Sequence, residues 1–268
     1  MFWVRLRSGI ILVAVALLTI ISGGTVLWAT TLCISLIGLS ELYRAVSVQK
    51  KENMGLALTG FLATVVYYGL LFFHLESYSM IAMVFVLVAF LFVYVFTFPK
   101  YQAEQVMSAF FGVIYVCVML SYIYQTRNLQ DGAFLVWLIF LCSWGCDTCA
   151  YCVGMLIGKH KMSPILSPKK SVEGAVGGVV GAALLGAVYA LAVGKYLRAE
   201  NQVVIYAVIC AVGALISMVG DLAASAIKRN HEIKDYGTLI LGHGGILDRF
   251  DSVIFTAPII YFLASVLI

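Results

Sequence analysis

Nine long apolar runs constrain this chain more than any other feature of its sequence. A helix needs about 20 apolar residues to cross the hydrocarbon core of a bilayer, and lipid offers no partner for exposed backbone groups, which favours helices. The sequence therefore predicts an all-α, polytopic integral membrane protein with about nine transmembrane helices. The runs lie at residues 9–23, 25–43, 54–73, 79–98, 106–124, 132–154, 174–194, 202–224 and 251–268.

The composition excludes the other classes of chain. Hydrophobic residues make up 63% of the 268 residues and charged residues 11%, against about 45–50% and 25% in soluble domains. A soluble globular, disordered or disulfide-stapled protein is thereby excluded. The first run follows Arg5 and Arg7 and has a signal peptide as its alternative reading. We expect a retained helix because no small-residue cleavage site follows it, and Gly23-Gly24 predicts a tight turn.

The basic residues predict the orientation of the chain. With the N-terminus in the cytoplasm, 14 of the 17 Lys and Arg residues fall on the cytoplasmic side, as the positive-inside rule requires. Only Arg127, Lys195 and Arg198 fall on the opposite side.

Two polar loops divide the chain into two regions. Residues 155–173 and 225–250 are the longest polar stretches and carry eight of the basic residues. We expect residues 1–130 to form a lipid-facing scaffold and residues 131–268 to form a catalytic region at the cytoplasmic face.

Four acids in the second region require an explanation, because an Asp at the centre of a membrane helix costs about 2.5–3.5 kcal/mol. They are Asp147, Asp221, Asp248 and Asp251. The alternative is that acids near helix ends reach the interface or pair with a neighbouring base. Asp248 and Asp251, at positions i and i+3 in the first turn of the last helix, suit a hard cation such as Mg²⁺.

A second pattern places complementary groups beside these acids. If the helix continues past residue 224, Asp221, Ser225, Lys228 and Arg229 share one face. Upstream of Asp248, the run Gly242-His243-Gly244-Gly245 lets backbone N–H groups approach a phosphate closely.

Two further segments bear on ligand binding. Ser167, Lys169, Lys170 and Ser171 precede a helix N-terminus and suggest a phosphate site, although this segment taken alone favours the reading that the two lysines contact lipid headgroups. The seven cysteines lie within apolar runs, where helix packing is favoured over a metal site, and no disulfide framework is expected.

Residues 225–252 resemble the phosphatidate cytidylyltransferase (CDP-diglyceride synthase) family. The resemblance rests on the segments Ser225-Ala226-Ile227-Lys228-Arg229, Lys234-Asp235-Tyr236-Gly237 and His243-Gly244-Gly245-Ile246-Leu247-Asp248-Arg249-Phe250-Asp251-Ser252. Segments at Asp147–Tyr151, with Gly154, Gly158 and Lys159, and at Ser167–Gly174 are similar to upstream motifs of the family. The likeness covers about residues 145–255. Two residues depart from the family pattern. Leu241 stands where the family usually has Pro or Gly, and Val172 stands where it often has Trp.

The resemblance implies an integral membrane nucleotidyltransferase. It implies conversion of CTP and phosphatidic acid into CDP-diacylglycerol and pyrophosphate, with Mg²⁺ and a second cation such as K⁺, in a homodimer. We expect Asp221, Asp248 and Asp251 as metal ligands. The expected phosphate-contacting, site-shaping and substrate-binding residues are Lys228, Arg229, Lys234, Asp235, His243, Arg249, Asp147, Ser167, Lys169, Lys170, Ser171, Ser225, Gly244 and Gly245.

Two alternatives remain open at this point. One is a cation-coupled secondary transporter with Asp221 and Asp147 as coupling sites, and the other is a related CTP-dependent enzyme acting on an isoprenoid or ether lipid. The compact length and the lack of recognisable organelle-targeting features predict a bacterial inner membrane, and no nucleic-acid partner is expected.

Overall fold

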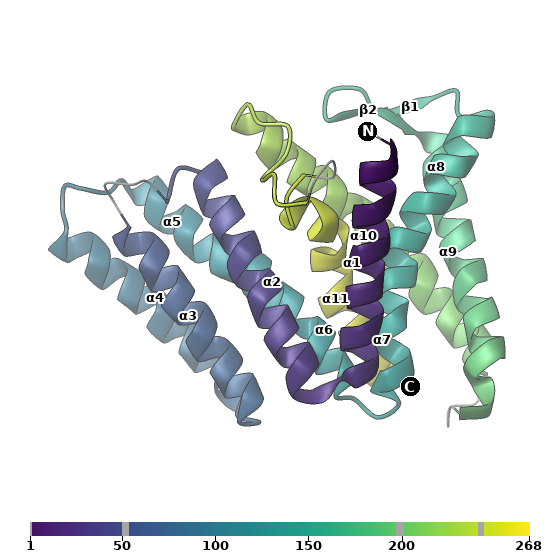
Figure 1. The fold of residues 1–268 in the computed structure, drawn as a ribbon, viewed down its shortest axis with the longest axis horizontal. Coiled ribbons are helices and arrows are strands. Elements are labelled where there is room, and N and C mark those ends of the chain that lie inside the picture. Colours follow the sequence, from purple (N-terminus) through teal and green to yellow (C-terminus); the bar gives the residue numbers. More distant parts are fainter. Residues whose placement is uncertain (1, 50–53, 197–200, 241–243) are drawn as a thin grey trace. The chain divides into compact units, whose positions relative to one another are not determined.

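The computed structural model of the protein describes residues 2–49, 54–196, 201–240 and 244–268 (Figure 1). The described chain is nearly all helical, with one short pair of strands. The α-helices are α1 (Phe2–Ser22), α2 (Gly24–Ala45), α3 (Gly55–Phe72), α4 (Ser79–Phe96), α5 (Ala103–Gly112), α6 (Met119–Arg127), α7 (Gly132–Phe140), α8 (Cys146–Ile157), α9 (Val172–Val193), α10 (Gln202–Asn230) and α11 (Leu247–Leu267). The shorter elements are the 3₁₀-helices η1 (Glu76–Tyr78) and η4 (Gly194–Tyr196), the π-helices η2 (Val113–Val118) and η3 (Leu141–Gly145), and the strands β1 (Lys161–Ser163) and β2 (Ser167–Ser171).

The predicted membrane architecture is confirmed. Among the described residues, eight helical runs are long and apolar enough to cross a membrane, and α1 adds a shorter apolar stretch at Gly9–Ser22. The eight runs are Gly24–Ala45, Gly55–Phe72, Glu76–Phe96, Ala103–Arg127, Gly132–Ile157, Val172–Tyr196, Gln202–Asn230 and Leu247–Leu267. The protein is therefore an integral membrane protein.

Three local expectations are settled by the backbone. Gly23 and Gly24 have φ angles of 60° and 47°, which confirms the tight turn between α1 and α2. The loop predicted at 225–250 is wrong at its start, because α10 stays helical to Asn230. The segment 155–173 is not simply a loop either, because β1 and β2 form an antiparallel hairpin within it.

The structure divides into two compact units, each built from separate stretches of sequence. Unit 1 contains residues 1–124 and 231–249, and unit 2 contains residues 125–230 and 250–268. Residues 231–240 and 244–249 thus belong to the same compact unit as the N-terminal helices.

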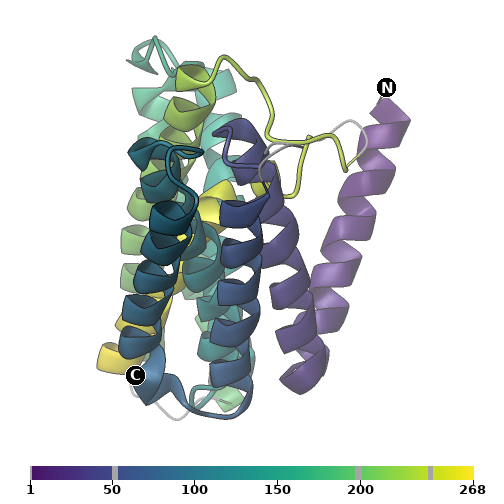
Figure 2. The ribbon, with the colours of Figure 1, turned by 90° about the vertical axis from the view of Figure 1, so that its left-hand side faces the viewer.

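Polar side chains inside unit 1 form hydrogen bonds with other residues of the same unit. Its helix α1 runs back antiparallel to α2 from the Gly23 turn, and α2 lies against α3 (Figure 2). Trp28 Nε1 donates to the Tyr68 carbonyl at 2.8 Å and Tyr43 Oη donates to the Ala109 carbonyl at 2.7 Å. Such bonds satisfy buried polar groups that have no water partner in lipid.

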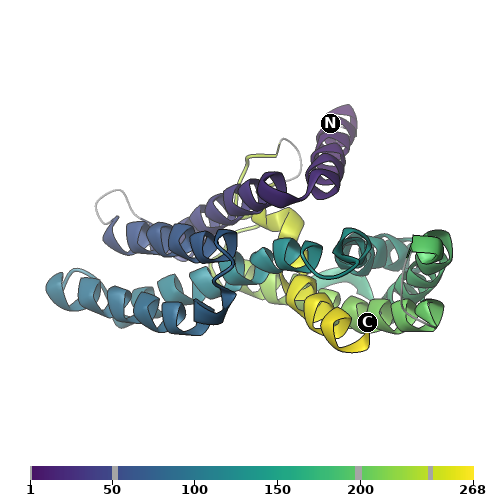
Figure 3. The ribbon, with the colours of Figure 1, turned by 90° about the horizontal axis from the view of Figure 1, so that it is seen from below.

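Unit 2 is a bundle in which α9 contacts both α8 and α10 (Figure 3). Glycines of α9 allow the close approach to α8. A Cβ added at Gly178 would lie 3.0 Å from both Ala150 Cβ and Cys146 Sγ. Small residues in membrane helices permit such contacts between helices.

Candidate active site

In unit 2, α10 and α11 cross where the acids of the predicted site lie. A Cβ added at Gly220 would fall 3.0 Å from the carbonyl oxygen of Asp251 and 2.9 Å from Phe255 Cβ, so Gly220 allows the two backbones to approach. Asp221 follows Gly220 directly. The crossing therefore brings Asp221 and the half-buried Asp251 into electrostatic range of each other.

Asp221 also pairs with a base from the hairpin. Lys170 Nζ on β2 forms an ion pair with Asp221 Oδ2, and the side chains of both residues are 26% exposed. One turn further along α10, Ser225 Oγ donates to Asp221 Oδ1 at 3.5 Å. The predicted shared face of α10 is thus confirmed for Asp221 and Ser225, and Lys170 neutralises part of the charge at Asp221.

The carboxylates of unit 2 have the chemistry that a magnesium ion requires. Mg²⁺ is usually bound by one or two carboxylates, with waters and substrate phosphates completing its shell. Among the residues that the structure describes, no three or more His, Cys, Asp or Glu side chains are arranged to hold a metal. Asp221 and Asp251 supply carboxylate oxygens of the kind that Mg²⁺ prefers as ligands.

Asp248 lies in unit 1, in the first turn of α11, where the sequence placed it. Its side chain organises the preceding loop: Oδ2 accepts the backbone N–H of Tyr236 at 2.8 Å and that of Gly245 at 2.9 Å. Gly244 has a φ of 86°, a conformation that favours glycine.

A second buried acid of unit 1, Glu41 of α2, was missed by the sequence reasoning. Its side chain is fully buried, and its carboxylate accepts the backbone N–H groups of Ile246 and Leu247. Glu41 lies inside the predicted run 25–43, so the rule that singled out Asp147 also applies to it. The presence of an acid within an apolar run was the sequence signal that could have identified Glu41.

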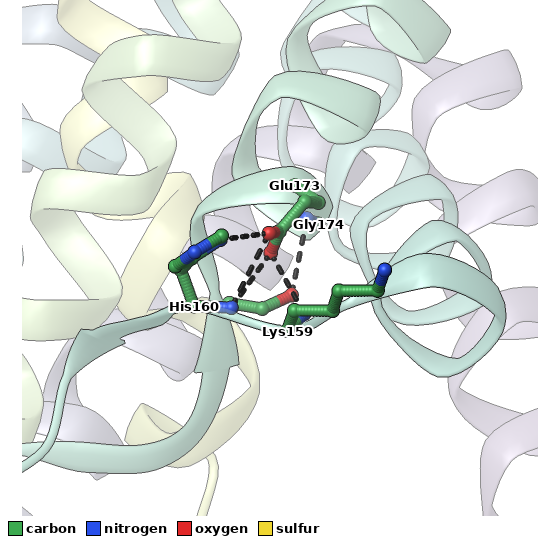
Figure 4. A network of polar contacts seen from close by, with 5 residues as sticks. Lys159, His160, Glu173 and Gly174 are labelled. Carbon is green, nitrogen blue, oxygen red and sulfur yellow. Dashed lines mark hydrogen bonds and ion pairs between the residues drawn. The ribbon is translucent and has the colours of Figure 1, made fainter.

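The segment before α9 contains a compact polar network (Figure 4). Glu173 accepts the backbone N–H groups of Lys159 at 3.1 Å and His160 at 3.2 Å, and its Oε1 lies 2.5 Å from His160 Nδ1. Ser171 Oγ accepts the N–H of Gly174 at 3.1 Å and so caps α9. The Ser171 hydroxyl proposed to contact phosphate thus has a structural partner.

The other predicted site residues are distributed over both units. Lys228, Asp147 and Ser167 of unit 2 are half-buried, whereas Arg229 and Lys169 of the same unit are exposed. In unit 1, Lys234 and Asp235 are exposed, Arg249 is half-buried and Gly245 is buried. His243 and the departure at Leu241 lie outside the described residues.

The cysteines behave as expected for packing residues. All seven are free, and Cys142, Cys146 and Cys210 are buried between helices of unit 2. A Cβ added at Gly213 would lie 2.6 Å from Cys142 Sγ, and one added at Gly186 would lie 2.6 Å from Cys210 Sγ. These thiols therefore occupy space beside glycines.

Comparison with known proteins covers almost the entire chain. The profile of the cytidylyltransferase family matches residues 3–267. A phosphatidate cytidylyltransferase of Staphylococcus saprophyticus is 32% identical over 263 residues, which cover 97% of this chain and 98% of that protein. The protein of the same name from Staphylococcus aureus is 30% identical over 263 residues, covering the same shares of the two chains. The one from Bacillus subtilis is 38% identical over 156 residues, 58% of this chain and 56% of that protein.

The match extends well beyond the motifs that carried the resemblance. It includes the N-terminal helices, whose sequence alone resembled the family only in being hydrophobic. The enzyme expectation is confirmed, because the family model and the three relatives are all cytidylyltransferases. The chain belongs to the cytidylyltransferase family and is a membrane-embedded nucleotidyltransferase.

Proposed function

We propose that this protein is a phosphatidate cytidylyltransferase, which converts CTP and phosphatidic acid into CDP-diacylglycerol and pyrophosphate. The observation that carries the proposal is the end-to-end similarity to proteins of that name, at 32% identity over 97% of the chain. The acids and bases of the α10–α11 crossing supply groups suited to the reaction.

The chemistry needs no nucleophile from the protein. An anionic oxygen of the lipid phosphate attacks the α-phosphorus of CTP, and a new P–O–P bond forms between lipid and nucleotide. The bond from the α-phosphorus to the oxygen that bridges it to the β-phosphate breaks, and pyrophosphate leaves with that electron pair. The enzyme must bring two anions together and stabilise the charge on the leaving group.

Basic residues of the chain are proposed to bind the phosphate groups of the two substrates. We assign phosphate contacts to Lys170, Lys228, Arg229 and Arg249, because cations form strong charge-assisted bonds to phosphate oxygens. In this proposal Lys170, which forms an ion pair with Asp221, exchanges that carboxylate partner for a phosphate.

The same proposal includes a magnesium ion. Asp221 and Asp251 would bind it, Asp248 is likewise proposed as a metal ligand, and a second cation such as K⁺ would add to the positive charge. A bound Mg²⁺ would supply charge neutralisation at the nucleotide phosphates.

The direct test is a transfer assay with purified protein in detergent. Given CTP labelled at the α-phosphate, phosphatidic acid and Mg²⁺, the protein should produce labelled CDP-diacylglycerol and one pyrophosphate for each lipid. A folded protein that yields no lipid-linked label under any metal condition would refute the function. If an ether-linked analogue or an isoprenoid phosphate is the better acceptor, the related-enzyme alternative is supported.

Variants locate the chemistry within the chain. Asp221→Asn should abolish turnover while expression and folding persist. The matched control is Asp131→Asn, which makes the same chemical change in the turn before α7; Asp131 has a φ of 54°, a conformation that Asn tolerates. Normal turnover by Asp221→Asn would remove Asp221 from the metal site.

We also propose that the site faces the cytoplasm of a bacterial inner membrane and that the enzyme is a homodimer. The distribution of 14 of 17 basic residues supports the orientation. A protease site inserted beside the exposed Ile165 at the hairpin tip should be cut in inverted vesicles and protected in intact spheroplasts. The opposite pattern would reverse the orientation, and light scattering of the purified protein would test the dimer.

A further inference from the structure

Glu41 forms a contact between two distant parts of unit 1. Its Oε1 accepts the N–H of Ile246 at 3.1 Å, and its Oε2 accepts the N–H of Leu247 at 2.8 Å. The residue lies near the end of α2 and has none of its surface exposed. These two N–H groups belong to the start of α11, which begins at Leu247.

The contact supplies hydrogen-bond acceptors to the N-terminus of that helix. The first N–H groups of any helix have no partner within it, and a side-chain oxygen of the preceding residue usually accepts one of them. The residue before α11 is Ile246, whose side chain has no oxygen. Glu41 supplies the acceptors from another helix, and a carboxylate is further stabilised by the positive end of the helix dipole.

The loop before α11 is shaped to fit this carboxylate. A Cβ added at Gly245 would lie 2.6 Å from the carboxyl carbon of Glu41, and one added at Gly237 would lie 2.8 Å from it. Only glycine therefore fits at either position with Glu41 in place. The backbone of the loop closes around the Glu41 side chain at two points.

The residue after Leu247 is Asp248, which anchors the same segment from its other side. Asp248 Oδ2 accepts the N–H groups of Tyr236 and Gly245. Glu41 fixes residues 246 and 247, and Asp248 fixes residues 236 and 245. The two acids together hold the backbone of Tyr236 and of residues 245–247 in place.

We propose that Glu41 is a positioning residue that sets the place and orientation of Asp248. This inference rests on the proposed function, in which Asp248 is a metal ligand, and deepens it. Glu41 contacts no substrate in this role. It acts through the backbone at Ile246 and Leu247, and its removal changes how well the site binds a divalent cation.

Glu41→Gln is the sharpest variant, because it keeps the size of the side chain. The amide retains one acceptor oxygen and turns an NH₂ group toward a backbone N–H, so two donors face each other. Glu41→Asp keeps the charge on a shorter side chain and should recover part of the loss. Glu104→Gln is the matched control, because Glu104 of α5 is an exposed acid of the same unit.

Three measurements test the role. Removing a partner that orients a metal ligand commonly lowers metal affinity or activity about 10- to 100-fold. We therefore expect Glu41→Gln to weaken binding of Mn²⁺ alone about tenfold or more, as measured by electron paramagnetic resonance. At saturating Mg²⁺, the turnover number should fall while KM for CTP stays within about twofold of wild type, since no contact between the protein and the nucleotide is lost. Amide exchange of the metal-free protein should become faster in peptides that cover residues 244–250.

The outcomes separate this inference from the proposed function. If wild type transfers no cytidylyl group, the function is refuted, whereas Mn²⁺ binding and amide exchange still decide the role of Glu41. Wild-type Mn²⁺ affinity in Glu41→Gln overturns the inference, as does wild-type affinity in Asp248→Asn. An equal acceleration of exchange throughout the protein also overturns it, because Glu41 would then be a general stability residue.

Discussion

The packing of α9 against α8 leads to a prediction that can be worked out from distances. A Cβ added at Gly177 would lie 2.5 Å from Val153 Cγ2 and 2.6 Å from both Val153 Cβ and Val153 Cγ1. Valine in a helix has essentially one favoured rotamer, so its methyl groups do not rotate away. Gly177→Ala therefore requires the two helices to separate by several tenths of an ångström.

Two opposing effects determine the magnitude. Overpacking a tight contact costs about 1–3 kcal/mol, and replacing Gly by Ala in a helix gains about 1 kcal/mol. We expect Gly177→Ala to be destabilised by about 1 kcal/mol as the balance of these two effects. Gly69→Ala in α3 measures the gain alone, because a Cβ there would meet nothing within 4 Å.

The assay is equilibrium unfolding of the purified variants in the same detergent. Gly69→Ala should be more stable than wild type and Gly177→Ala less stable, which places the two variants about 2 kcal/mol apart. A larger side chain at the same position, in Gly177→Val, should lower the stability further. Stabilisation of Gly177→Ala equal to that of Gly69→Ala would refute the close contact between α8 and α9.

Three other predictions concern the site. Ser171→Ala removes the cap of α9 and should lower stability by about 1 kcal/mol, with KM for CTP unchanged; a raised KM at wild-type stability would restore the phosphate role of Ser171. A double-mutant cycle with Lys170→Met and Asp221→Asn should give a coupling free energy of about 1–2 kcal/mol, between the values of exposed and buried pairs, and additive effects would contradict the ion pair. Chelation with EDTA should stop CDP-diacylglycerol formation and added Mg²⁺ should restore it, whereas full activity in the chelator would exclude a required divalent cation.

Most of the fold could be predicted because a membrane helix forms its backbone hydrogen bonds within itself. Each apolar run can therefore be recognised without knowledge of its neighbours. The apolar runs located every spanning helix to within several residues, and Asp248 marked the start of α11, where a helix N-terminus favours an acid. The hairpin of β1 and β2 was missed because three-residue and five-residue strands leave no periodic pattern. The end of α10 was placed too early because its last turn is polar while its backbone stays helical.

The site was less predictable because its decisive contacts join distant residues. The sequence indicated Asp221, Ser225 and Asp251 through helical spacing, and the structure brings Lys170 of the hairpin to Asp221. Helical spacing cannot reveal such a partner 51 positions away along the chain. The same holds for Glu41, whose partners lie 205 and 206 positions away.

That separation has a consequence for the biosynthesis of the protein. At about 5–20 residues per second, about 10–40 s pass between the synthesis of Glu41 and that of Ile246. During this interval α2 contains a carboxylate that still lacks the two N–H groups it accepts in the finished protein. A chain that stops before residue 246 never supplies them and retains an unsatisfied acid in a membrane helix, which is costly in lipid. We therefore expect incomplete chains to be less stable in the membrane than the finished protein.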